Sequence, residues 1–333
     1  MRAFVINRYG KKERLHLVKV PQPVVKENDV LVEIHSAGLN LLDSKIRDGE
    51  FKLLLPYKPP FVLGHDVAGV VKSTGSKVSR FKVGDEVYAR PSDRRIGTFA
   101  EYIAIHENDV ALKPKDLSME EAASIPLVAL TAWQALVERA NLKKGQKVFI
   151  QAGSGGVGTI AIQLAKHLGA TVATTTSTSN VEWVKALGAD VVIDYKKDDF
   201  ENILRDYDVV LNSQDAPTLE KSLRVLKPGG KLISISGPPD SHFASQLKLG
   251  WLPKLIMSLL SYKVRKKAKR QHVHYSFLFM RAEGNQLSEI TSLINSGIIH
   301  PVMDTVFPFE QTNEALTYVK SGRAKGKVVV KVK

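Results

Sequence analysis

Apolar residues in the middle of the chain follow two periods, one typical of a strand and one typical of a helix. Residues 147–152 form a strand-like run, and after a glycine-rich stretch the apolar positions recur at spacings of three and four. Such spacings place side chains on one face of a helix. The positions concerned are Val157, Ile160, Ala161, Leu164, Ala165 and Leu168. The pattern predicts a strand, a tight turn and an amphipathic helix.

The residues before this unit read differently from the residues after it. Up to about residue 118, short strand-like runs at 3–6, 29–35, 66–71 and 84–89 are separated by Gly and Pro, which predicts a β-rich, barrel-like domain. Helical stretches at 120–124, broken by Pro126, and at 130–137 follow as a connection between domains. Beyond residue 147, strands are expected at 171–175, 191–194, 209–211, 231–236 and 276–280, with helices at 181–187 and 219–226 and a Lys-Pro-Gly-Gly stop at 227–230. Repeated alternation of strands and helices predicts a doubly wound parallel sheet.

The end of the chain is too short for a domain of its own. It contains a predicted helix at 286–295 and a terminal strand at 327–332, and we expect both to return to the β-rich domain. The predicted domains are therefore 1–121, completed by 281–333, and 122–280, with a cleft between them.

The turn at 153–158 reads Gly-Ser-Gly-Gly-Val-Gly and satisfies the pattern G-x-G-x-x-G. Glycines at these positions permit a sharp reversal, let the backbone approach a pyrophosphate and bring the helix against the strand, while the helix N-terminus offers N–H groups. The turn therefore predicts a nucleotide site that includes Gly153, Ser154, Gly155, Gly156 and Val157. The alternative is a tight strand-to-helix turn without a ligand.

The residues after the second predicted strand indicate which nucleotide binds. An NAD site usually has an acidic residue about twenty positions after the glycines, for the ribose hydroxyls. No acidic residue lies between Gly158 and Glu182, and residues 176–180 are neutral hydrogen-bonding residues that include Thr176, Ser177 and Asn180. This favours NADP(H), because no carboxylate repels a 2′-phosphate. The alternative is a loop that only caps the following helix.

The composition of the chain excludes some kinds of site. The chain has 333 residues, a net charge of +14 and no cysteine, so disulfides and thiolate ligands are excluded. The first residues lack the apolar stretch of a signal peptide, and a cytoplasmic location is the expectation.

A basic run at 263–272 follows an apolar run at 251–260. The two read either as a solvated helix after a hydrophobic flap or subunit contact, or as a segment that binds an anionic membrane or RNA.

Several motifs in order make the whole chain resemble the medium-chain dehydrogenase/reductase superfamily, and within it the zinc-free quinone oxidoreductase and enone reductase branch. They are AGLNLLDSKIR at 37–47, LGHDVAGVV at 63–71, FKVGDEVY at 81–88, the glycine turn preceded by Ala152, LGAD at 187–190 leading to Ile193-Asp194-Tyr195, and GRAKGKVV at 322–329. The resemblance implies a GroES-like β-rich catalytic domain, a Rossmann cofactor domain, a homodimer, and hydride transfer from NADPH in the cleft.

The resemblance also assigns roles to individual residues. It places Asn40 and Thr131 near the nicotinamide, and Gly155, Gly156 and Val157 at the pyrophosphate. Around the 2′-phosphate it places Ser177, Tyr195 and Arg323, and it turns the backbone of Phe277, Leu278 and Phe279 toward the carboxamide. Many relatives have a lysine where this chain has Ser179-Asn180, which shifts the weight of phosphate binding onto Arg323 and Tyr195.

Zinc is not expected. The histidine of zinc-dependent members matches His65, but their cysteine positions match Asn40 and an apolar stretch near Leu127, and the lobe for structural zinc is replaced by the short loop 91–95. We therefore interpret His65 and Asp66 as a hydrogen-bonded turn pair. A zinc-type alcohol dehydrogenase is the alternative enzyme.

Chemistry without a metal remains accessible to such a site. A quinone or a double bond conjugated to a carbonyl accepts hydride directly if donors hold the oxygen as negative charge builds. The candidate donors are Asn40, Tyr57 and Lys45, although Tyr57 lies in an aromatic and proline-rich stretch that also suits packing. The predicted function is NADPH-dependent reduction of quinones or α,β-unsaturated carbonyls. The alternative outside enzymology is a nucleic-acid-binding or membrane-binding protein that retains the cofactor fold.

Overall fold

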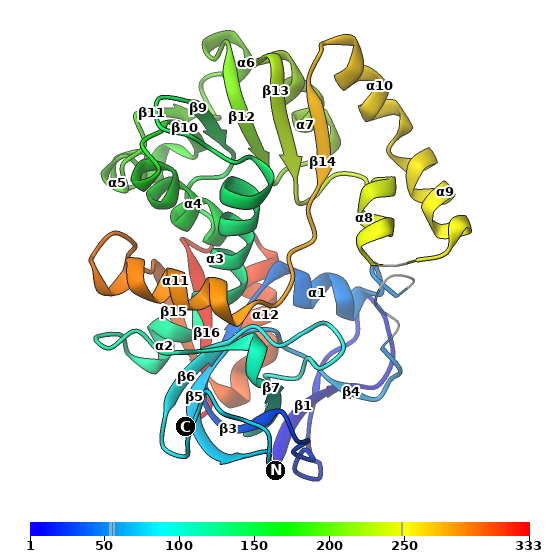
Figure 1. Ribbon diagram of the computed structural model, residues 1–333, viewed down its shortest axis with the longest axis vertical. Coiled ribbons are helices and arrows are strands. Elements are labelled where there is room, and N and C mark those ends of the chain that lie inside the picture. The colour runs from blue at the N-terminus through cyan, green and yellow to red at the C-terminus, as the bar shows by residue number, and fades with distance from the viewer. Residues whose placement is uncertain (53–54, 56, 248) are drawn as a thin grey trace. The chain divides into compact units, whose positions relative to one another are not determined.

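The structure is a computed structural model that describes residues 1–333 except 53, 54, 56 and 248. It divides into two compact units, one formed by Met1–Leu130 with Arg281–Lys333 and the other by Thr131–Met280. Figure 1 labels their elements. Within the described residues, no helix is both long and apolar enough to cross a membrane.

The first unit is built on two β-sheets. A three-stranded sheet has the order β2-β1-β4, and a seven-stranded sheet has the order β15-β16-β3-β5-β6-β8 with β7 paired to β3. The strands are β1 (Arg2–Ile6), β2 (His16–Lys19), β3 (Asp29–Leu39), β4 (Phe61–Val62), β5 (Val67–Thr74), β6 (Glu86–Ala89), β7 (Tyr102–His106), β8 (Val110–Leu112), β15 (Met303–Pro308) and β16 (Lys327–Lys331). The helices are α1 (Leu41–Asp48), α2 (Met119–Ala123), α11 (Gly284–Asn295) and α12 (Thr312–Lys320). Buried aliphatic and aromatic side chains from these strands form its core.

The last strand of the chain has a central place in this unit. β16 runs antiparallel to β3, with Val328 opposite Leu39 and Val330 opposite Ala37. Side chains alternate between the two faces of a strand, so register decides which groups meet. This register brings Lys327, at the start of β16, to the end of β3, where α1 begins.

The second unit contains a six-stranded sheet in the order β11-β10-β9-β12-β13-β14, and every pairing in it is parallel. The strands are β9 (Lys147–Ile150), β10 (Thr171–Thr176), β11 (Val191–Asp194), β12 (Tyr207–Asn212), β13 (Leu226–Ser234) and β14 (His274–Phe277). The helices are α4 (Gly156–His167), α5 (Val181–Ala186), α6 (Phe200–Ile203), α7 (Ala216–Arg224), α8 (Ser241–Gln246), α9 (Trp251–Leu260) and α10 (Tyr262–Arg270). The strand order reverses between β9 and β12, as in a Rossmann sheet. The predicted fold class is confirmed.

Two local expectations are wrong and a third is confirmed. The Lys-Pro-Gly-Gly stop lies inside β13, because the pairing with β12 shifts between Tyr207 opposite Leu226 and Val209 opposite Lys231 and so absorbs the extra residues as an irregularity. The break expected at Pro126 is confirmed, because α2 ends at Ala123 and Pro126 begins α3 (Pro126–Trp133), where the first helical position needs no N–H donor. The last strand of the sheet ends at Phe277 and does not extend to residue 280.

Candidate functional site

In the glycine turn between β9 and α4, an added Cβ would clash at Gly153 and Gly158 but would have room at Gly155. A Cβ added to Gly153 would lie 2.3 Å from the hydroxyl of Thr174, and one added to Gly158 would lie 2.2 Å from the carbonyl oxygen of Ala152. At Gly155 the only neighbour would be that same carbonyl, at 3.4 Å. The first and last glycines are therefore required by packing. Gly155 instead leaves its backbone open beside the N-terminus of α4, which fits a pyrophosphate.

A polar network lines the carboxyl ends of the central strands, where the strand order reverses. The side chain of Gln151 donates to Ser222 at 2.6 Å and accepts from Asn212 at 2.7 Å. Ser234 in turn donates to the Oδ1 of Asn212 at 2.5 Å. Sequence reasoning missed these residues, although polar residues at the ends of apolar strands were a usable signal. The network fixes the edge at which doubly wound sheets bind their ligands.

Of the residues predicted around the 2′-phosphate, Ser177 and Asn180 lie in the loop after β10, and Tyr195 directly follows β11. The amide of Asn180 donates to the hydroxyl of Ser177 at 3.1 Å and accepts from the indole of Trp183 at 3.1 Å, so Asn180 positions Ser177. The buried hydroxyl of Thr176 has no partner within the described residues. The ring of Tyr195 is 61% exposed. The exposed Tyr195 and the half-buried Ser177 leave hydroxyls available to a ligand, whereas the hydroxyl of Thr176 is enclosed by the protein.

One acidic residue near this loop escaped the sequence reasoning, because it comes from the next strand. Asp194 ends β11, and its carboxylate accepts from the hydroxyl of Thr178 at 2.7 Å and from the backbone N–H of Lys196 at 3.1 Å. These hydrogen bonds, that from Thr178 first, hold the pKa of Asp194 below its usual range. A search for an acid directly after β10 could not find it.

The other residues predicted to contact the cofactor lie in different parts of the structure. The backbone N–H of Phe277 donates to Asp240 at 3.2 Å and that of Leu278 to the carbonyl of Ser234 at 2.8 Å, so both donors serve the unit itself. Thr131 is buried in α3. Arg323 lies in the first unit after α12, where its exposed guanidinium forms no ion pair with the described residues.

In the first unit, Asn40 sits at the centre of a buried cluster. The ammonium of Lys327 donates to the carbonyl of Leu39 at 2.9 Å, to the Oδ1 of Asn40 at 2.7 Å and to the Oδ2 of Asp66 at 2.9 Å. The same Oδ2 accepts from the amide of Asn40 at 2.9 Å, and the other oxygen of Asp66 accepts from the backbone N–H of Leu127 at 2.7 Å. Lys327 is 5% exposed and Asp66 is fully buried.

The orientation of the Asn40 amide follows from its two neighbours. An ammonium only donates and a carboxylate only accepts, so the oxygen must face Lys327 and the NH₂ must face Asp66. Because an ammonium has three hydrogens, the three contacts of Lys327 use all of them. The NH₂ of Asn40 has a second hydrogen, which has no acceptor within the described part of the chain.

The interpretation of His65 and Asp66 as a hydrogen-bonded pair is wrong. The Nδ1 of His65 lies 2.6 Å from a carboxylate oxygen of Asp43, while Asp66 pairs with Lys327. The other carboxylate oxygen of Asp43 accepts from the backbone N–H of Asn40 at 2.7 Å. The reason is local geometry: Asp43 lies in the first turn of α1, and its carboxylate satisfies an open N–H there while also reaching the ring.

The two remaining donor candidates are not part of this cluster. The hydroxyl of Tyr57 is buried without a partner in the described residues, and burial raises the pKa of Tyr57. Its ring packs against Phe61 at a centroid distance of 5.0 Å. Lys45 is two residues after Asp43 on α1, a rotation of about 200° that points it away from the cluster.

Comparison with known families matches both parts of the chain. The model of the alcohol dehydrogenase GroES-like domain matches residues 26–115, and the model of the zinc-binding dehydrogenase family matches residues 187–330.

Individual relatives match over nearly the full length. The zebrafish (Danio rerio) mitochondrial NAD(P)H oxidoreductase RTN4IP1 is 36% identical over 100% of this chain and 91% of its own length. The Arabidopsis thaliana chloroplastic NADPH-dependent alkenal/one oxidoreductase is also 36% identical, over 99% of this chain and 79% of its own. The solved structure of the quinone oxidoreductase from Coxiella burnetii superimposes with a TM-score of 0.87 at 30% identity, covering 100% of this chain and 99% of the other.

The description of one matched family implies zinc, but the residues of this chain do not fit that ion. The sequence has no cysteine, and the oxygens of Asp66 and Asn40 already accept from the ammonium of Lys327. His65 retains a buried Nε2 without a partner, yet no group of three His, Asp or Glu side chains suited to a metal occurs among the described residues. Zinc needs three or four such ligands.

Proposed function

The chain belongs to the medium-chain dehydrogenase/reductase superfamily, and from this premise we propose that it reduces quinones or α,β-unsaturated carbonyl compounds with NADPH. When bound, the nucleotide supplies a hydride from C4 of its nicotinamide ring. With an enone, that hydride forms a C–H bond at the β-carbon, and the π-electrons move to the carbonyl oxygen as an enolate. Water then supplies a proton to the α-carbon.

The second unit holds the nucleotide in this proposal. Support comes from Gly155, whose open backbone and adjoining helix N-terminus suit the pyrophosphate. The hydroxyls of Ser177 and Tyr195 suit a 2′-phosphate, and the carboxylate of Asp194 is occupied by Thr178 and Lys196. The predicted roles of Thr131, Arg323 and the backbone of 277–279 remain predictions from the family.

In this proposal Asn40 is the donor for the substrate oxygen, and the observation that carries it is how Lys327 and Asp66 hold the Asn40 amide. Lys327 has no hydrogen left to offer, whereas Asn40 keeps one N–H that has no acceptor among the described residues and is fixed in direction by Lys327 and Asp66. A preorganised neutral donor stabilises developing negative charge without a cost of reorganisation. The chain thus orients the carbonyl and needs no titrating acid.

The experiment uses the full chain and measures nucleotide binding separately from turnover. NADPH fluorescence titration should show tighter binding than NADH. Oxidation of NADPH should follow addition of benzoquinone or a short enone, and Asn40→Ala should lower kcat by about 10²-fold, the scale of losing one oxyanion donor. Asn202→Ala, on α6 of the other unit, is the matched control and should change neither quantity. Absence of NADPH oxidation with every acceptor would overturn the proposal.

Two further properties remain predictions: the homodimer implied by the family, and the cytoplasmic location inferred from the N-terminal sequence. Sedimentation of the purified chain measures the first, and imaging of a tagged chain in its own cell measures the second.

A further inference from the structure

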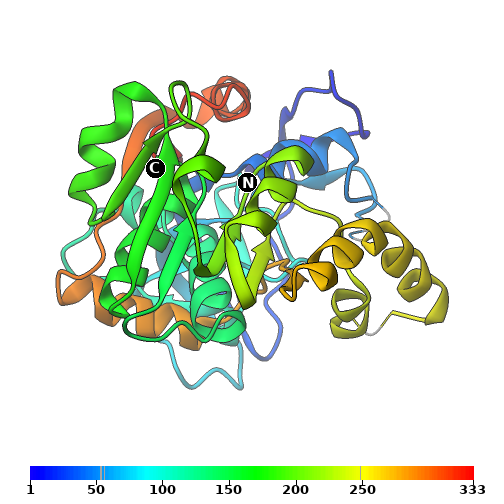
Figure 2. The same ribbon diagram turned by 90° about the horizontal axis from the view of Figure 1, so that it is seen from above.

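The helix α9 exposes an apolar face that no described residue of its own unit covers. Its exposed side chains form two adjacent rows along the helix, because residues four positions apart lie above one another. One row contains Trp251, Leu255 and Leu259, and the other Leu252, Ile256 and Leu260. Trp251 is 77% and Leu259 is 65% exposed, and only Met257 points into the unit. Figure 2 shows α9, in yellow to gold, on the outside of its unit and away from the sheet.

This concentration is unusual within the chain itself. Of the seventeen large hydrophobic side chains that are exposed in the described residues, eight lie between Leu247 and Tyr262. Single exposed apolar residues are ordinary, but a contiguous apolar face on a polar-rimmed surface indicates an interaction site.

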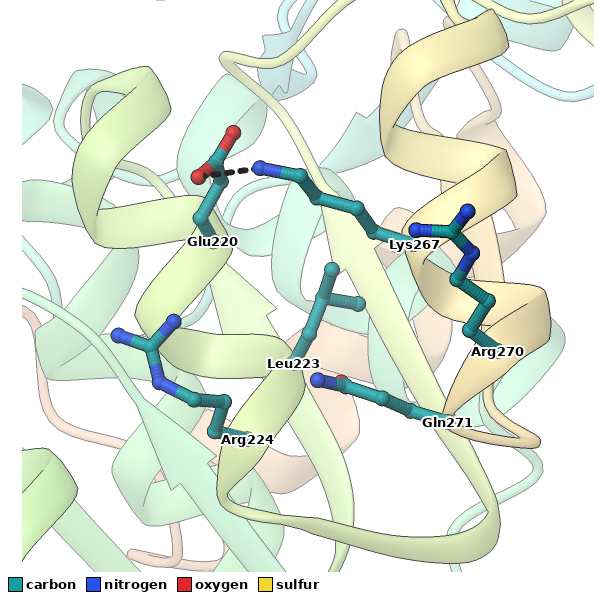
Figure 3. Close-up of a pocket in the computed structure, with 6 residues that line it drawn as sticks. All are labelled: Glu220, Leu223, Arg224, Lys267, Arg270 and Gln271. Atoms are coloured by element: carbon teal, nitrogen blue, oxygen red, sulfur yellow. Dashed lines mark ion pairs between the residues drawn. The ribbon is translucent and has the colours of Figure 1, made fainter.

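The next helix, α10, is strongly cationic. Six of its nine residues are Lys or Arg, and the segment 241–282 contains nine Lys or Arg and no Asp or Glu. The acidic group that faces α10 from a neighbouring element is Glu220 of α7, which pairs with Lys267 at 2.7 Å, as Figure 3 shows at the inner side of α10. Lys263, Lys269 and Arg270 form no ion pair within the described residues.

The two surfaces are joined rigidly enough to act together. Arg265 of α10 donates to the backbone carbonyl of Ser258 at 3.2 Å and to its hydroxyl at 2.8 Å, which ties α10 to the last turn of α9. At the junction, the ammonium of Lys266 lies 5.6 Å from the centroid of the Tyr262 ring. The apolar helix and the cationic helix are therefore held together at their junction.

We propose that α9 and α10 dock this protein on the surface of an anionic lipid bilayer. The rows of α9 enter the boundary between headgroups and acyl chains, and the lysines and arginines of α10 contact headgroup anions. With ten residues, α9 is about 15 Å long and lies in the plane of the interface, since it is too short to span. Trp251 begins α9, and Tyr262 begins α10 just after α9 ends. Trp and Tyr are the residue types that favour the headgroup level.

Charge and polarity favour lipid over the other occupants. A second copy meeting this surface would place the six cations of α10 near six more on a chain of net charge +14. A nucleic acid would neutralise α10 but leave the leucines of α9 exposed, because it reads proteins through phosphates and stacked bases. An anionic bilayer satisfies both surfaces at once.

The test is cosedimentation of the full chain with vesicles, which does not depend on the proposed reductase activity. Vesicles of phosphatidylcholine with 30% phosphatidylserine should bind the chain at least about tenfold more tightly than phosphatidylcholine alone, and 0.5 M salt should remove most of this difference. Lys266→Glu with Lys269→Glu should weaken binding by about tenfold or more. Leu255→Glu with Leu259→Glu should abolish it. Circular dichroism and NADPH titration confirm that each variant remains folded.

Matched controls change the same number of residues elsewhere. Lys143→Glu with Lys144→Glu reverses two exposed cations of the same unit, and Val24→Glu with Val83→Glu places charge on two exposed apolar positions of the other; both should bind vesicles like the parent chain.

Three results would overturn the proposal. The first is failure of the parent chain to bind anionic vesicles, and the second is equal binding by the variants of α9 and α10. The third is a dimer that dissociates in the α9 variant, or salt-sensitive retention on RNA without vesicle binding, which would assign the surface to a second copy or to nucleic acid.

Discussion

Replacing Lys327 by methionine should destabilise the first unit far more than removing an exposed lysine from the same strand. Methionine keeps most of the aliphatic volume, so packing changes little. The lost ammonium leaves the fully buried carboxylate of Asp66 with two donors among the described residues, the amide of Asn40 and the N–H of Leu127. It also leaves the carbonyl of Leu39 and the Oδ1 of Asn40 without the donor they have now.

The magnitude follows from what remains at Asp66. Removing one partner of a buried ion pair costs about 3–5 kcal/mol, because the other charge stays buried without compensation. Since two N–H donors remain, we expect the lower end, about 3 kcal/mol. The matched control is Lys331→Met: Lys331 lies on β16 as well, but it is 58% exposed and pairs with Glu120 at 3.1 Å. Exposed pairs contribute about 0–1 kcal/mol.

The assay can separate the two units because all three tryptophans, Trp133, Trp183 and Trp251, lie in the second. In urea, far-ultraviolet circular dichroism reports both units and tryptophan fluorescence reports the second. Lys327→Met should lower the dichroism midpoint by about 1 M or more, given slopes of about 1–3 kcal/mol per M, and affect fluorescence less. Combining it with Asp66→Leu should cost less than the sum of the two single changes. A loss no larger than that of Lys331→Met would refute the reasoning.

Three further predictions concern the turn, an ion pair and a hydroxyl. Gly155→Ala should keep the melting temperature but weaken NADPH binding by about tenfold, since the new Cβ would meet only the carbonyl of Ala152 among the described residues. Gly158→Ala should instead lower the melting temperature, because the same carbonyl would lie 2.2 Å from the new atom. Hydrogen bonds from Lys333, Lys72 and Tyr102 lower the pKa of Glu33 to about 2. The contribution of Glu33 to the free energy of unfolding is therefore complete above its ordinary pKa of 4.5 and is lost as the pH falls from there toward 2. In acid unfolding, Glu33→Gln should lose less stability than the parent over that pH range. Tyr57→Phe removes a buried hydroxyl without a described partner, so stability should stay within about 1 kcal/mol and kcat within about threefold; a larger fall of kcat would make Tyr57 a donor beside Asn40.

The parts of the fold that the sequence predicts are those with a local cause. The alternation of strands and helices and the glycine turn each depend on spacings within about twenty residues, and the parallel sheet of the second unit confirms that expectation. The irregularity inside β13 could not be predicted in the same way, because Pro and Gly usually end a strand and only the neighbouring β12 shows that pairing resumes at Lys231.

The contacts of the candidate site join residues that lie far apart in the sequence. Lys327 reaches Asp66 across 261 residues of sequence through the register of β16 on β3, and no spacing rule connects the two positions. His65 was paired with its sequence neighbour for the same reason, whereas its actual partner, Asp43, comes from the first turn of α1. Likewise, the rows of α9 at spacings of four fit a buried face as well as an exposed one, so only the structure could show that they face outward.

The buried ammonium also bears on why the residues around Asn40 do not suit a zinc ion. A divalent ion beside Lys327 would face a fixed positive charge within a few ångströms, and at an effective dielectric constant of 20 their repulsion is on the order of several kcal/mol. The same oxygens of Asp66 and Asn40 cannot serve both cations fully, because Lys327 already lies 2.9 and 2.7 Å from them. The lysine holds Asn40 by its oxygen, so the free N–H of the amide keeps one direction. A positive charge fixed by the fold thus orients a neutral donor in a family whose zinc-dependent members place a metal ligand at that position.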